Sequence, residues 1–219
     1  MDIGIVGATG YSGLELVRIL SKHPNVTNMN FYSTSAYKED LSTYFPHLSG
    51  TVKGAIQKWD KDRSPAENDV LFFATPHGVS SELINEIQHS NTKLIDLSGD
   101  FRLKNEQEYQ KWYKQNHACF TKTAQFTYGL TELNRDSIKH SNYISNPGCY
   151  PTATLLGIGP LLKSGIIAEN SIIIDAKSGI SGAGKSANNI TQFMNRNENL
   201  TAYKINEHQH TPEIEQFIE

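Results

Sequence analysis

The stretch IGIVGATGYSGLELVRIL (residues 3–20) gives the strongest indication of the fold. Residues 3–6 form a short apolar run that is typical of a strand, and apolar residues then recur at helical spacing until His23-Pro24. Glycines at positions 7, 10 and 13 join the two segments. Such glycines allow a tight turn and let backbone N–H groups approach a pyrophosphate at the helix N-terminus. We therefore predict a dinucleotide-binding loop, with a glycine-rich turn that holds no ligand as the alternative.

Strand-like and helix-like segments continue to alternate up to about residue 148. Further strands are expected at residues 26–32, 70–76 and 93–99, and helices at residues 80–87 and 105–115. The run VLFFATP at 70–76 shows no polar alternation, which predicts a strand buried on both faces. Strands that alternate with helices indicate an α/β fold with a mainly parallel sheet.

The pattern changes after residue 148. A helix is expected at residues 151–163, followed by an apolar run at 171–179 and a loop of small residues. HTPEIEQFIE at 210–219 resembles the opening of a helix, with Pro212 near its first position, and no C-cap signal follows. We predict a first domain at residues 1–148 and an incomplete second domain at 149–219.

The composition excludes several classes of protein. The 219 residues include 20 Lys and Arg and 23 Asp and Glu, a net charge of −3 that gives no reason to expect a nucleic-acid partner. No apolar stretch is long enough to cross a membrane, and residues 1–10 do not resemble a signal peptide. Cys119 and Cys149 are the two cysteines. Free thiols in a cytoplasmic protein are expected, with a disulfide between them as the alternative.

The end of the second expected strand bears on the choice of cofactor. An enzyme selective for NAD usually places an acidic residue there to hold the ribose 2′-OH. This chain has Ser33 and Ser35 in that region, followed by Lys38. Hydroxyls with a cation suit a 2′-phosphate, so NADP is expected. The alternative is a solvated loop with no ligand.

The segment SNPGCYPT (residues 145–152) contains the candidate nucleophile. An expected strand enters a Pro-Gly turn, and a helix is expected to begin directly after Cys149. The helix dipole stabilises a thiolate at that position, which favours nucleophilic catalysis. A buried structural cysteine is the alternative for Cys149, and it is the interpretation that we adopt for Cys119.

Two histidines are candidates for acid–base catalysis. His208 and His210 lie two residues apart beside an expected helix start, and they point the same way if the segment is extended. A metal site is the competing interpretation, but two histidines without a third clear ligand do not favour one. No metal is expected.

Eight segments in order carry a resemblance to a known family. They are GATGYSG (7–13), YFPHL (44–48), ATPHGVS (74–80), DLSGDFRL (96–103), YGLTELNR (128–135), NPGCYPTA (146–153), SGISGAGK (178–185) and HQHTPEIEQ (208–216). The chain resembles the N-acetyl-gamma-glutamyl-phosphate reductases, the arginine-biosynthetic family of the semialdehyde dehydrogenase superfamily. Lys185 stands where that family usually has arginine, and Gly99 where it usually has alanine.

The resemblance implies a Rossmann-type, NADP-binding parallel-sheet domain followed by a partial α+β catalytic domain that mediates oligomerisation. It implies that Cys149 is acylated by N-acetyl-L-glutamyl 5-phosphate, and that NADPH reduces the thioester to N-acetyl-L-glutamate 5-semialdehyde. A dimer or tetramer of the full-length protein is expected. His210, which precedes Thr211, fits the family's acid–base histidine better than His208, which is kept in reserve.

We expect the following residues to form the site. The cofactor would contact Gly7, Thr9, Gly10, Tyr11, Ser12, Gly13, Ser33, Ser35, Lys38, Ser181 and Gly182. The substrate would contact Arg102, Asn146 and Lys185, and a surface salt bridge is the alternative for Arg102 and Lys185. Three rival functions stay open: a related aminoadipyl or aspartyl acyl-phosphate reductase, a non-catalytic dinucleotide-binding protein, and a structural interaction domain.

Overall fold

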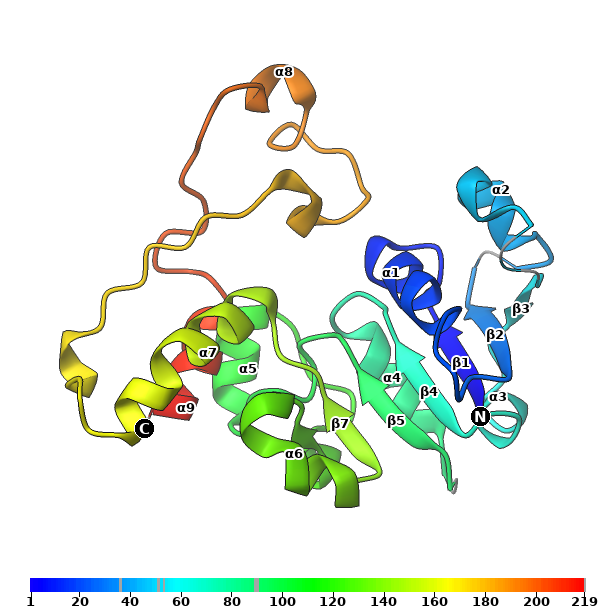
Figure 1. The fold of residues 1–219 in the computed structure, drawn as a ribbon, viewed down its shortest axis with the longest axis horizontal. Helices are drawn as coiled ribbons and strands as arrows, with labels where there is room; N and C mark the ends of the chain where they lie inside the picture. Colours follow the sequence, from blue (N-terminus) through cyan, green and yellow to red (C-terminus); the bar gives the residue numbers. More distant parts are fainter. Residues whose placement is uncertain (36, 51, 53, 89–90, 219) are drawn as a thin grey trace. The chain divides into compact units, whose positions relative to one another are not determined.

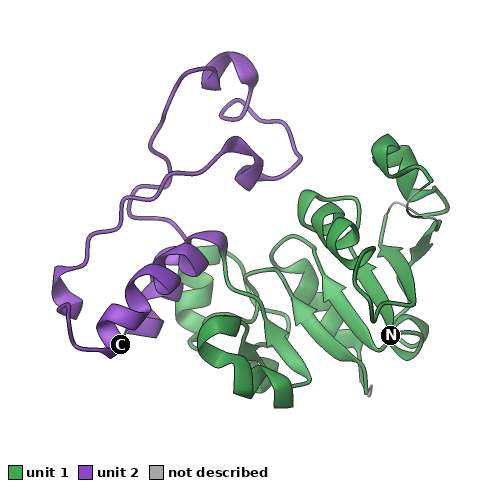
Figure 2. Ribbon diagram, in the orientation of Figure 1, with its two compact units in different colours: residues 1–148 green, residues 149–219 purple. Residues whose placement is uncertain are grey.

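The computed structural model describes residues 1–35, 37–50, 52, 54–88 and 91–218 (Figure 1). The chain divides into two compact units, residues 1–148 and residues 149–219 (Figure 2). Within the described ranges, no helix is long and apolar enough to span a membrane.

The first unit is built on a parallel sheet, which confirms the predicted α/β class. Its described strands follow the order β3-β2-β1-β4-β5-β7-β6, and every neighbouring pair is parallel. The strands are β1 (Asp2–Val6), β2 (Asn28–Ser33), β3 (Ile56–Lys58), β4 (Val70–Phe73), β5 (Lys93–Asp96), β6 (Thr127–Tyr128) and β7 (Tyr143–Ser145). The helices are α1 (Tyr11–Leu20), α2 (Leu41–Tyr44), η1 (Pro46–Leu48), α3 (Arg63–Ala66), α4 (Val79–Glu86), α5 (Glu106–Tyr113), η2 (Phe120–Gln125) and α6 (Thr131–His140).

Strand β4 shows why the sheet is stable. Leu71 and Phe73 belong to the apolar cluster on one face, whereas Val70 and Phe72 pack against the cluster on the other. Val17 of α1 lies in the second cluster, and α4 contributes to the first. The predicted strand is therefore present, but it ends at Phe73 and not at residue 76, and Val70 and Phe72 on its second face are only half-buried.

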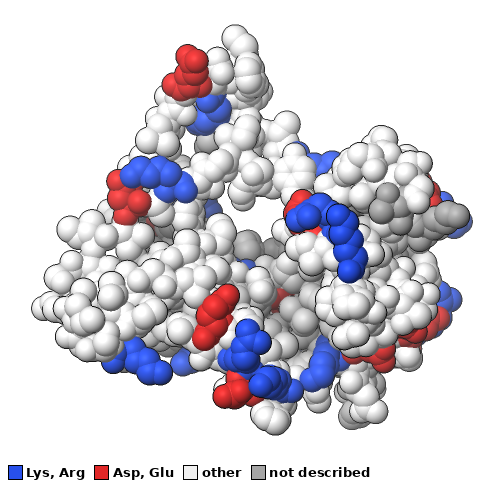
Figure 3. Space-filling view, in the orientation of Figure 1, with Lys and Arg blue, Asp and Glu red and all other residues white. Residues whose placement is uncertain are grey.

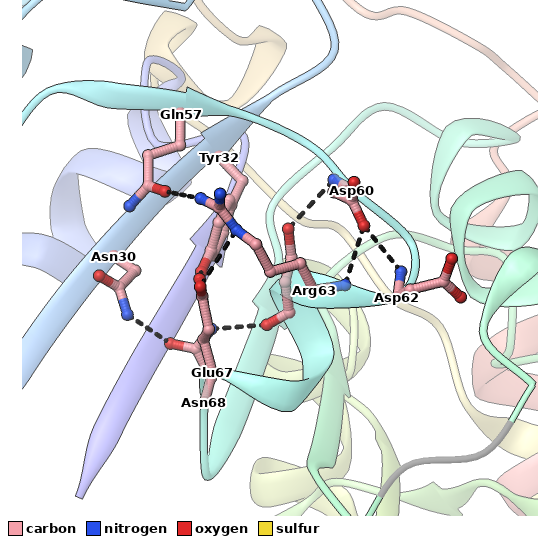
Figure 4. A network of polar contacts seen from close by, with 9 residues as sticks. Asn30, Tyr32, Gln57, Asp60, Asp62, Arg63, Glu67 and Asn68 are labelled. Carbon is pink, nitrogen blue, oxygen red and sulfur yellow. Dashed lines mark hydrogen bonds and ion pairs between the residues drawn. The ribbon is translucent and has the colours of Figure 1, made fainter.

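A polar network secures one side of this sheet (Figure 4). The buried Asn68 amide donates to the Tyr32 hydroxyl at 2.8 Å and to the Ser64 carbonyl at 2.7 Å. Its oxygen accepts from the Asn30 amide at 3.0 Å. Burial raises the pKa of Tyr32, so its hydroxyl stays neutral and needs a hydrogen-bond partner. The network joins β2 to the segment that precedes β4.

The strand order reverses direction between β1 and β4. From β1 the chain continues outward to β2 and β3, and then returns to β4 on the other side of β1. In open parallel sheets, ligands bind where the order reverses in this way. The Ala74 N–H donates to the Val6 carbonyl at 2.8 Å, which keeps the two strand ends adjacent.

The second unit is described as helices and irregular segments. Helices α7 (Cys149–Lys163) and α9 (His210–Ile218) pack against each other, and the chain between them contains η3 (Glu169–Ser171), η4 (Ile180–Ala183) and α8 (Phe193–Arg196) (Figure 2). We predicted an α+β domain, but residues 149–218 contain no strand. A strand needs a neighbour for its backbone hydrogen bonds. The apolar run at 171–179 has no such neighbour among the described residues, and Ile173 is 94% exposed.

Candidate active site

Two glycines of the loop after β1 are required by the protein's own packing. Gly7 has a φ of +87°, and a Cβ there would lie 2.5 Å from the Ala74 carbonyl oxygen. A Cβ on Gly13 would lie 2.5 Å from the Gly7 carbonyl oxygen. These glycines therefore let the turn pass close to β4 and bring α1 against the loop.

Gly10 differs, because packing does not explain it. Its φ is −85°, and the atom nearest to an added Cβ would lie 3.6 Å away. Gly10 is the N-cap of α1, where no side chain caps the helix and no acidic residue lies in the first turn. A helix N-terminus with these properties fits an anion such as a pyrophosphate.

The other predicted residues of this loop lie at the same helix start. Tyr11 and Ser12 are exposed in the first turn of α1, and Thr9 is half-buried just before it. The predicted residues of 7–13 thus lie in the turn after β1 and in the first turn of α1. Their contacts with a cofactor stay a prediction.

The loop after β2 lies beside the glycine turn. The Gly7 N–H donates to the Tyr32 carbonyl at 3.0 Å, which joins the ends of β1 and β2. The Ser33 hydroxyl accepts from the Ser35 N–H at 3.2 Å. Lys38 is exposed, and its N–H donates to the Ile56 carbonyl at 2.7 Å. This arrangement fits the predicted 2′-phosphate contact but does not test it.

Two buried carboxylates, one at the end of β5 and one after it, were not predicted. Asp96 accepts from the Ser98 hydroxyl at 2.7 Å, and burial, together with the nearby Asp100 charge, raises the pKa of Asp96 to about 6. Asp100 accepts from the N–H groups of Gly78 and Ser81, at 2.8 and 2.9 Å, at the start of α4. The motif DLSGD at the end of an expected strand was the available signal, because polar residues at that edge of a parallel sheet often serve a site.

The buried Arg102 side chain links two backbone segments by hydrogen bonds. It is 6% exposed; its Nε donates to the Asn146 carbonyl at 2.8 Å and its Nη2 to the Leu97 carbonyl at 2.7 Å. Arg102 is therefore not a surface residue. These two hydrogen bonds of Arg102 join the ends of β5 and β7. The Asn146 N–H also donates to the Asp96 carbonyl at 2.7 Å. Substrate binding by Arg102 and by the exposed Asn146 stays a prediction.

Cys149 is exposed at the first position of α7. The helix thus begins two residues earlier than predicted, and the thiol belongs to its first turn. Both cysteines are free in the structure. Cys119 is buried, its Sγ donates to the Ser81 carbonyl at 3.3 Å, and burial raises the pKa of this thiol to about 11. The two thiols therefore have opposite environments.

The predicted histidines lie together at the start of α9. His210 is the first residue of that helix, and the ring centroids of His208 and His210 are 4.7 Å apart. The Tyr150 ring, next to Cys149 in the chain, lies 5.1 Å from His208 and 5.7 Å from His210. Burial, followed by the charge of Lys204, lowers the pKa of His208. The packed helices α7 and α9 therefore bring the imidazoles to the residue beside the thiol.

The remaining predicted residues lie in the irregular part of the second unit. Ser181 and Gly182 belong to η4, Lys185 follows it, and all are exposed. Their predicted contacts with cofactor and substrate are not tested by the structure. Within the described ranges, no group of three His, Cys, Asp or Glu residues could hold a metal ion. On the face drawn in Figure 3, basic and acidic residues are interspersed.

Sheet order, glycine turn and uncapped helix start define the first unit as a Rossmann-type dinucleotide-binding fold. The second unit adds an exposed thiol and paired imidazoles at two helix starts. The chain belongs to the semialdehyde dehydrogenase family. Residues 2–141 match the family "Semialdehyde dehydrogenase, NAD binding domain", and residues 149–219 match "Semialdehyde dehydrogenase, dimerisation domain".

Curated relatives match the whole chain. It is 51% identical over 219 residues to an N-acetyl-gamma-glutamyl-phosphate reductase of Geobacillus sp. (strain WCH70), covering 100% of this chain and 63% of the relative. It is 48% identical over 218 residues to the protein of that name from Bacillus subtilis (strain 168), with the same coverage. The chain thus spans 63% of the length of these relatives.

Solved structures share the fold. Aspartate semialdehyde dehydrogenase II from Vibrio cholerae superposes with a TM-score of 0.55 at 15% identity, covering 74% of this chain and 42% of that one. Aspartate semialdehyde dehydrogenase with NADP from Candida albicans gives a TM-score of 0.51 at 13% identity, covering 74% and 47%.

Proposed function

We propose that this chain carries the site for NADPH-dependent reduction of N-acetyl-L-glutamyl 5-phosphate to N-acetyl-L-glutamate 5-semialdehyde, a step of arginine biosynthesis. One observation carries the proposal: an exposed Cys149 begins α7, and the His208–His210 pair contacts the adjacent Tyr150. The chain shares about half of its residues with proteins named N-acetyl-gamma-glutamyl-phosphate reductase. We therefore propose this acyl phosphate as the substrate in preference to the aminoadipyl and aspartyl compounds.

The cofactor would be held by the first unit. The N–H groups at the start of α1, where no side chain caps the helix, suit the pyrophosphate. Ser33, Ser35 and Lys38 suit a ribose 2′-phosphate, and residues 33–35 contain no carboxylate that would repel it. NADP is therefore proposed over NAD. A nicotinamide held there would supply the hydride for reduction of the thioester.

The chain's own residues perform the covalent chemistry. The Cys149 thiolate attacks the acyl carbon and forms a C–S bond, and phosphate leaves with the electron pair of the broken C–O bond. Once the acyl carbon is reduced, its oxygen would re-form the C=O bond, the C–S bond would break with its electron pair left on the Cys149 sulfur, and the aldehyde would leave. His210 takes the thiol proton before attack and returns it to sulfur at release. N–H groups at the start of α7 stabilise the carbonyl oxygen when it is negative.

The second unit is also proposed as the surface between copies in a homo-oligomer. Its match to a dimerisation domain supports this, as do its exposed apolar side chains. Two free thiols suit a cytoplasmic location.

Acylation of Cys149 tests the proposed reaction directly. The chain is mixed with N-acetyl-L-glutamyl 5-phosphate, and the thioester adduct is located by mass spectrometry. We expect the adduct on Cys149, its loss in Cys149→Ser and its retention in the matched control Cys119→Ala. A chain that binds NADPH but forms no adduct would instead be a non-catalytic dinucleotide-binding protein.

Substrate selectivity is measured in the reverse direction. Phosphate-dependent oxidation is compared for N-acetylglutamate semialdehyde, its aminoadipate homologue and aspartate semialdehyde. One methylene is worth about 1–3 kcal/mol in a pocket, so the preference over the homologue is expected to be roughly 10- to 200-fold. Faster turnover of either rival would replace the proposed substrate.

A further inference from the structure

A row of tyrosine and histidine side chains lies between the starts of α7 and α9. The Tyr150 and Tyr203 hydroxyls are 2.7 Å apart, and the Tyr203 hydroxyl lies 3.4 Å from Nε2 of His208. The Tyr203 and His208 rings also make an edge contact, with centroids 5.6 Å apart. Tyr203 comes from the irregular segment before α9, and the reaction proposed above assigns it no role.

The start of α9 determines which nitrogen of His208 carries hydrogen. The backbone N–H of His210 donates to Nδ1 of His208 at 3.1 Å. Because Nδ1 accepts this hydrogen bond, the neutral ring must carry its own hydrogen on Nε2. Nε2–H then donates to the Tyr203 oxygen. The Tyr203 and Tyr150 hydroxyls share the next hydrogen bond, in which either can be the donor. Tyr203 therefore links His208 to Tyr150.

The same contacts oppose a proton on Nδ1 of His208. A charged ring would direct Nδ1–H at the N–H of His210, so the hydrogen bond that orients the ring would become a repulsion. Burial and Lys204 lower the pKa of His208, which favours the neutral ring as well. Since both of its nitrogens are committed, His208 is better suited to hold its neighbours than to exchange protons.

Building on the proposed function, we propose that Tyr203 and His208 are positioning residues of the Cys149 site. The hydroxyl row and the His210 N–H hold His208 as the neutral Nε2–H tautomer. In that state the His208 ring packs against Tyr150 and His210, at centroid distances of 5.1 and 4.7 Å, and keeps both beside the start of α7. His210 is left as the residue that exchanges the thiol proton.

The tautomer is tested by ¹⁵N NMR of the histidine rings in this chain at pH 7.5. We expect His208 to be neutral with its hydrogen on Nε2. Tyr203→Phe keeps the ring but removes the acceptor, so the Nε2 resonance should shift. The matched control Tyr143→Phe removes a hydroxyl from β7 in the first unit and should leave that resonance unchanged. A charged His208, an Nδ1–H tautomer, or no shift in Tyr203→Phe would overturn the proposal.

The rate of Cys149 acylation separates positioning from proton exchange. His208→Asn keeps an acceptor oxygen near the Nδ1 position but cannot ionise, so its maximal rate should stay within about tenfold of wild type. His210→Asn should lose about a hundredfold or more. Tyr203→Phe should lower the maximal rate about three- to tenfold without changing the half-saturating concentration, because a 3.4 Å contact is a weak hydrogen bond. Equal losses in His208→Asn and His210→Asn would overturn the assignment.

The two experiments distinguish failure of the inference from failure of the proposed function. If wild-type Cys149 is never acylated, the proposed reaction is wrong. The NMR tautomer of His208 still decides whether Tyr203 and the His210 N–H hold that ring.

Discussion

The two units place their large apolar side chains in opposite environments. In the first unit, Leu71 and Phe73 are 0% exposed, and apolar clusters cover both faces of the sheet. In the second unit, Ile173, Met194 and Leu200 are 94%, 86% and 73% exposed. Burying a side chain of this size contributes about 1.5–3 kcal/mol. The first unit thus has a core of its own, whereas the segment between α7 and α9 gains little from apolar burial within the described residues.

The comparison predicts its largest effect for matched apolar truncations. Leu71→Ala should lower the free energy of unfolding by about 2–5 kcal/mol, because it leaves a cavity in a closed core. Ile173→Ala should change it by less than about 0.5 kcal/mol. Urea denaturation at low protein concentration measures both. A loss above 1 kcal/mol in Ile173→Ala would show that this side chain is covered in solution, and a loss that grows with protein concentration would assign the cover to a second copy.

Two glycine substitutions in the first unit compare a glycine that packing requires with one that packing does not explain. Gly7→Ala should lower the free energy of unfolding by about 1–3 kcal/mol, because its φ of +87° and the Ala74 carbonyl both exclude a Cβ. Gly10→Ala should cost less than about 1 kcal/mol but weaken NADPH binding, because its Cβ would occupy space at the start of α1. Denaturation and NADPH titration measure the two effects. Unchanged NADPH affinity in Gly10→Ala would remove this helix start from the cofactor site.

The buried carboxylate of Asp96 predicts a pH dependence specific to the first unit. Its folded pKa of about 6 lies above the usual 3.8, so the native state favours the protonated form. This contribution to stability is present below pH 3.8 and is lost as the pH rises through 6. Asp96→Asn cannot ionise, so its stability relative to wild type should rise by on the order of 2 kcal/mol between pH 4 and 7.

Unfolding measured across that pH range checks the Asp96 prediction. Asp62→Asn, an exposed aspartate in the same unit, is the matched control and should show no such trend. A relative stability of Asp96→Asn that stays flat with pH would mean that folding does not raise the pKa of Asp96.

The sequence predicted what depends on neighbouring residues. The alternation of strand and helix signals, the glycine turn and the cysteine at a helix start all arise within a few residues of one another, so local pattern was sufficient. The two-residue strand β6 was missed because its only described strand partner, β7, is distant in sequence and the strand has no periodicity of its own. The α+β class of the second unit was expected from the family resemblance and not from a local pattern, and a strand also requires a partner.

Contacts between site residues that lie far apart in the sequence could not be predicted. Arg102 is 44 residues from the Asn146 carbonyl that it binds, and Tyr150 is 53 residues from Tyr203. An arginine uses the same guanidinium group to form a surface ion pair, to contact a substrate or to bind two buried carbonyls, so only the fold distinguishes these roles. Similarly, the order of hydrogen bonds around His208 depends on a backbone N–H whose direction is set by the start of α9.

The smallest expected effect comes from surface ion pairs, which both units carry. Arg18 and Glu15 pair at 2.8 Å on α1 with more than half of each side chain exposed, and Lys177 pairs with Asp175 in the second unit. Exposed pairs contribute about 0–1 kcal/mol, so Arg18→Gln and Lys177→Gln should each lower the free energy of unfolding by less than about 0.5 kcal/mol. The difference in unfolding free energy between each variant and wild type should vanish in 1 M salt, where the screening length is about 3 Å. A larger loss in either variant would mean that ion pairs, and not apolar burial, cause the difference in stability between the two units. Equal small losses would mean that the apolar core around β4 causes it.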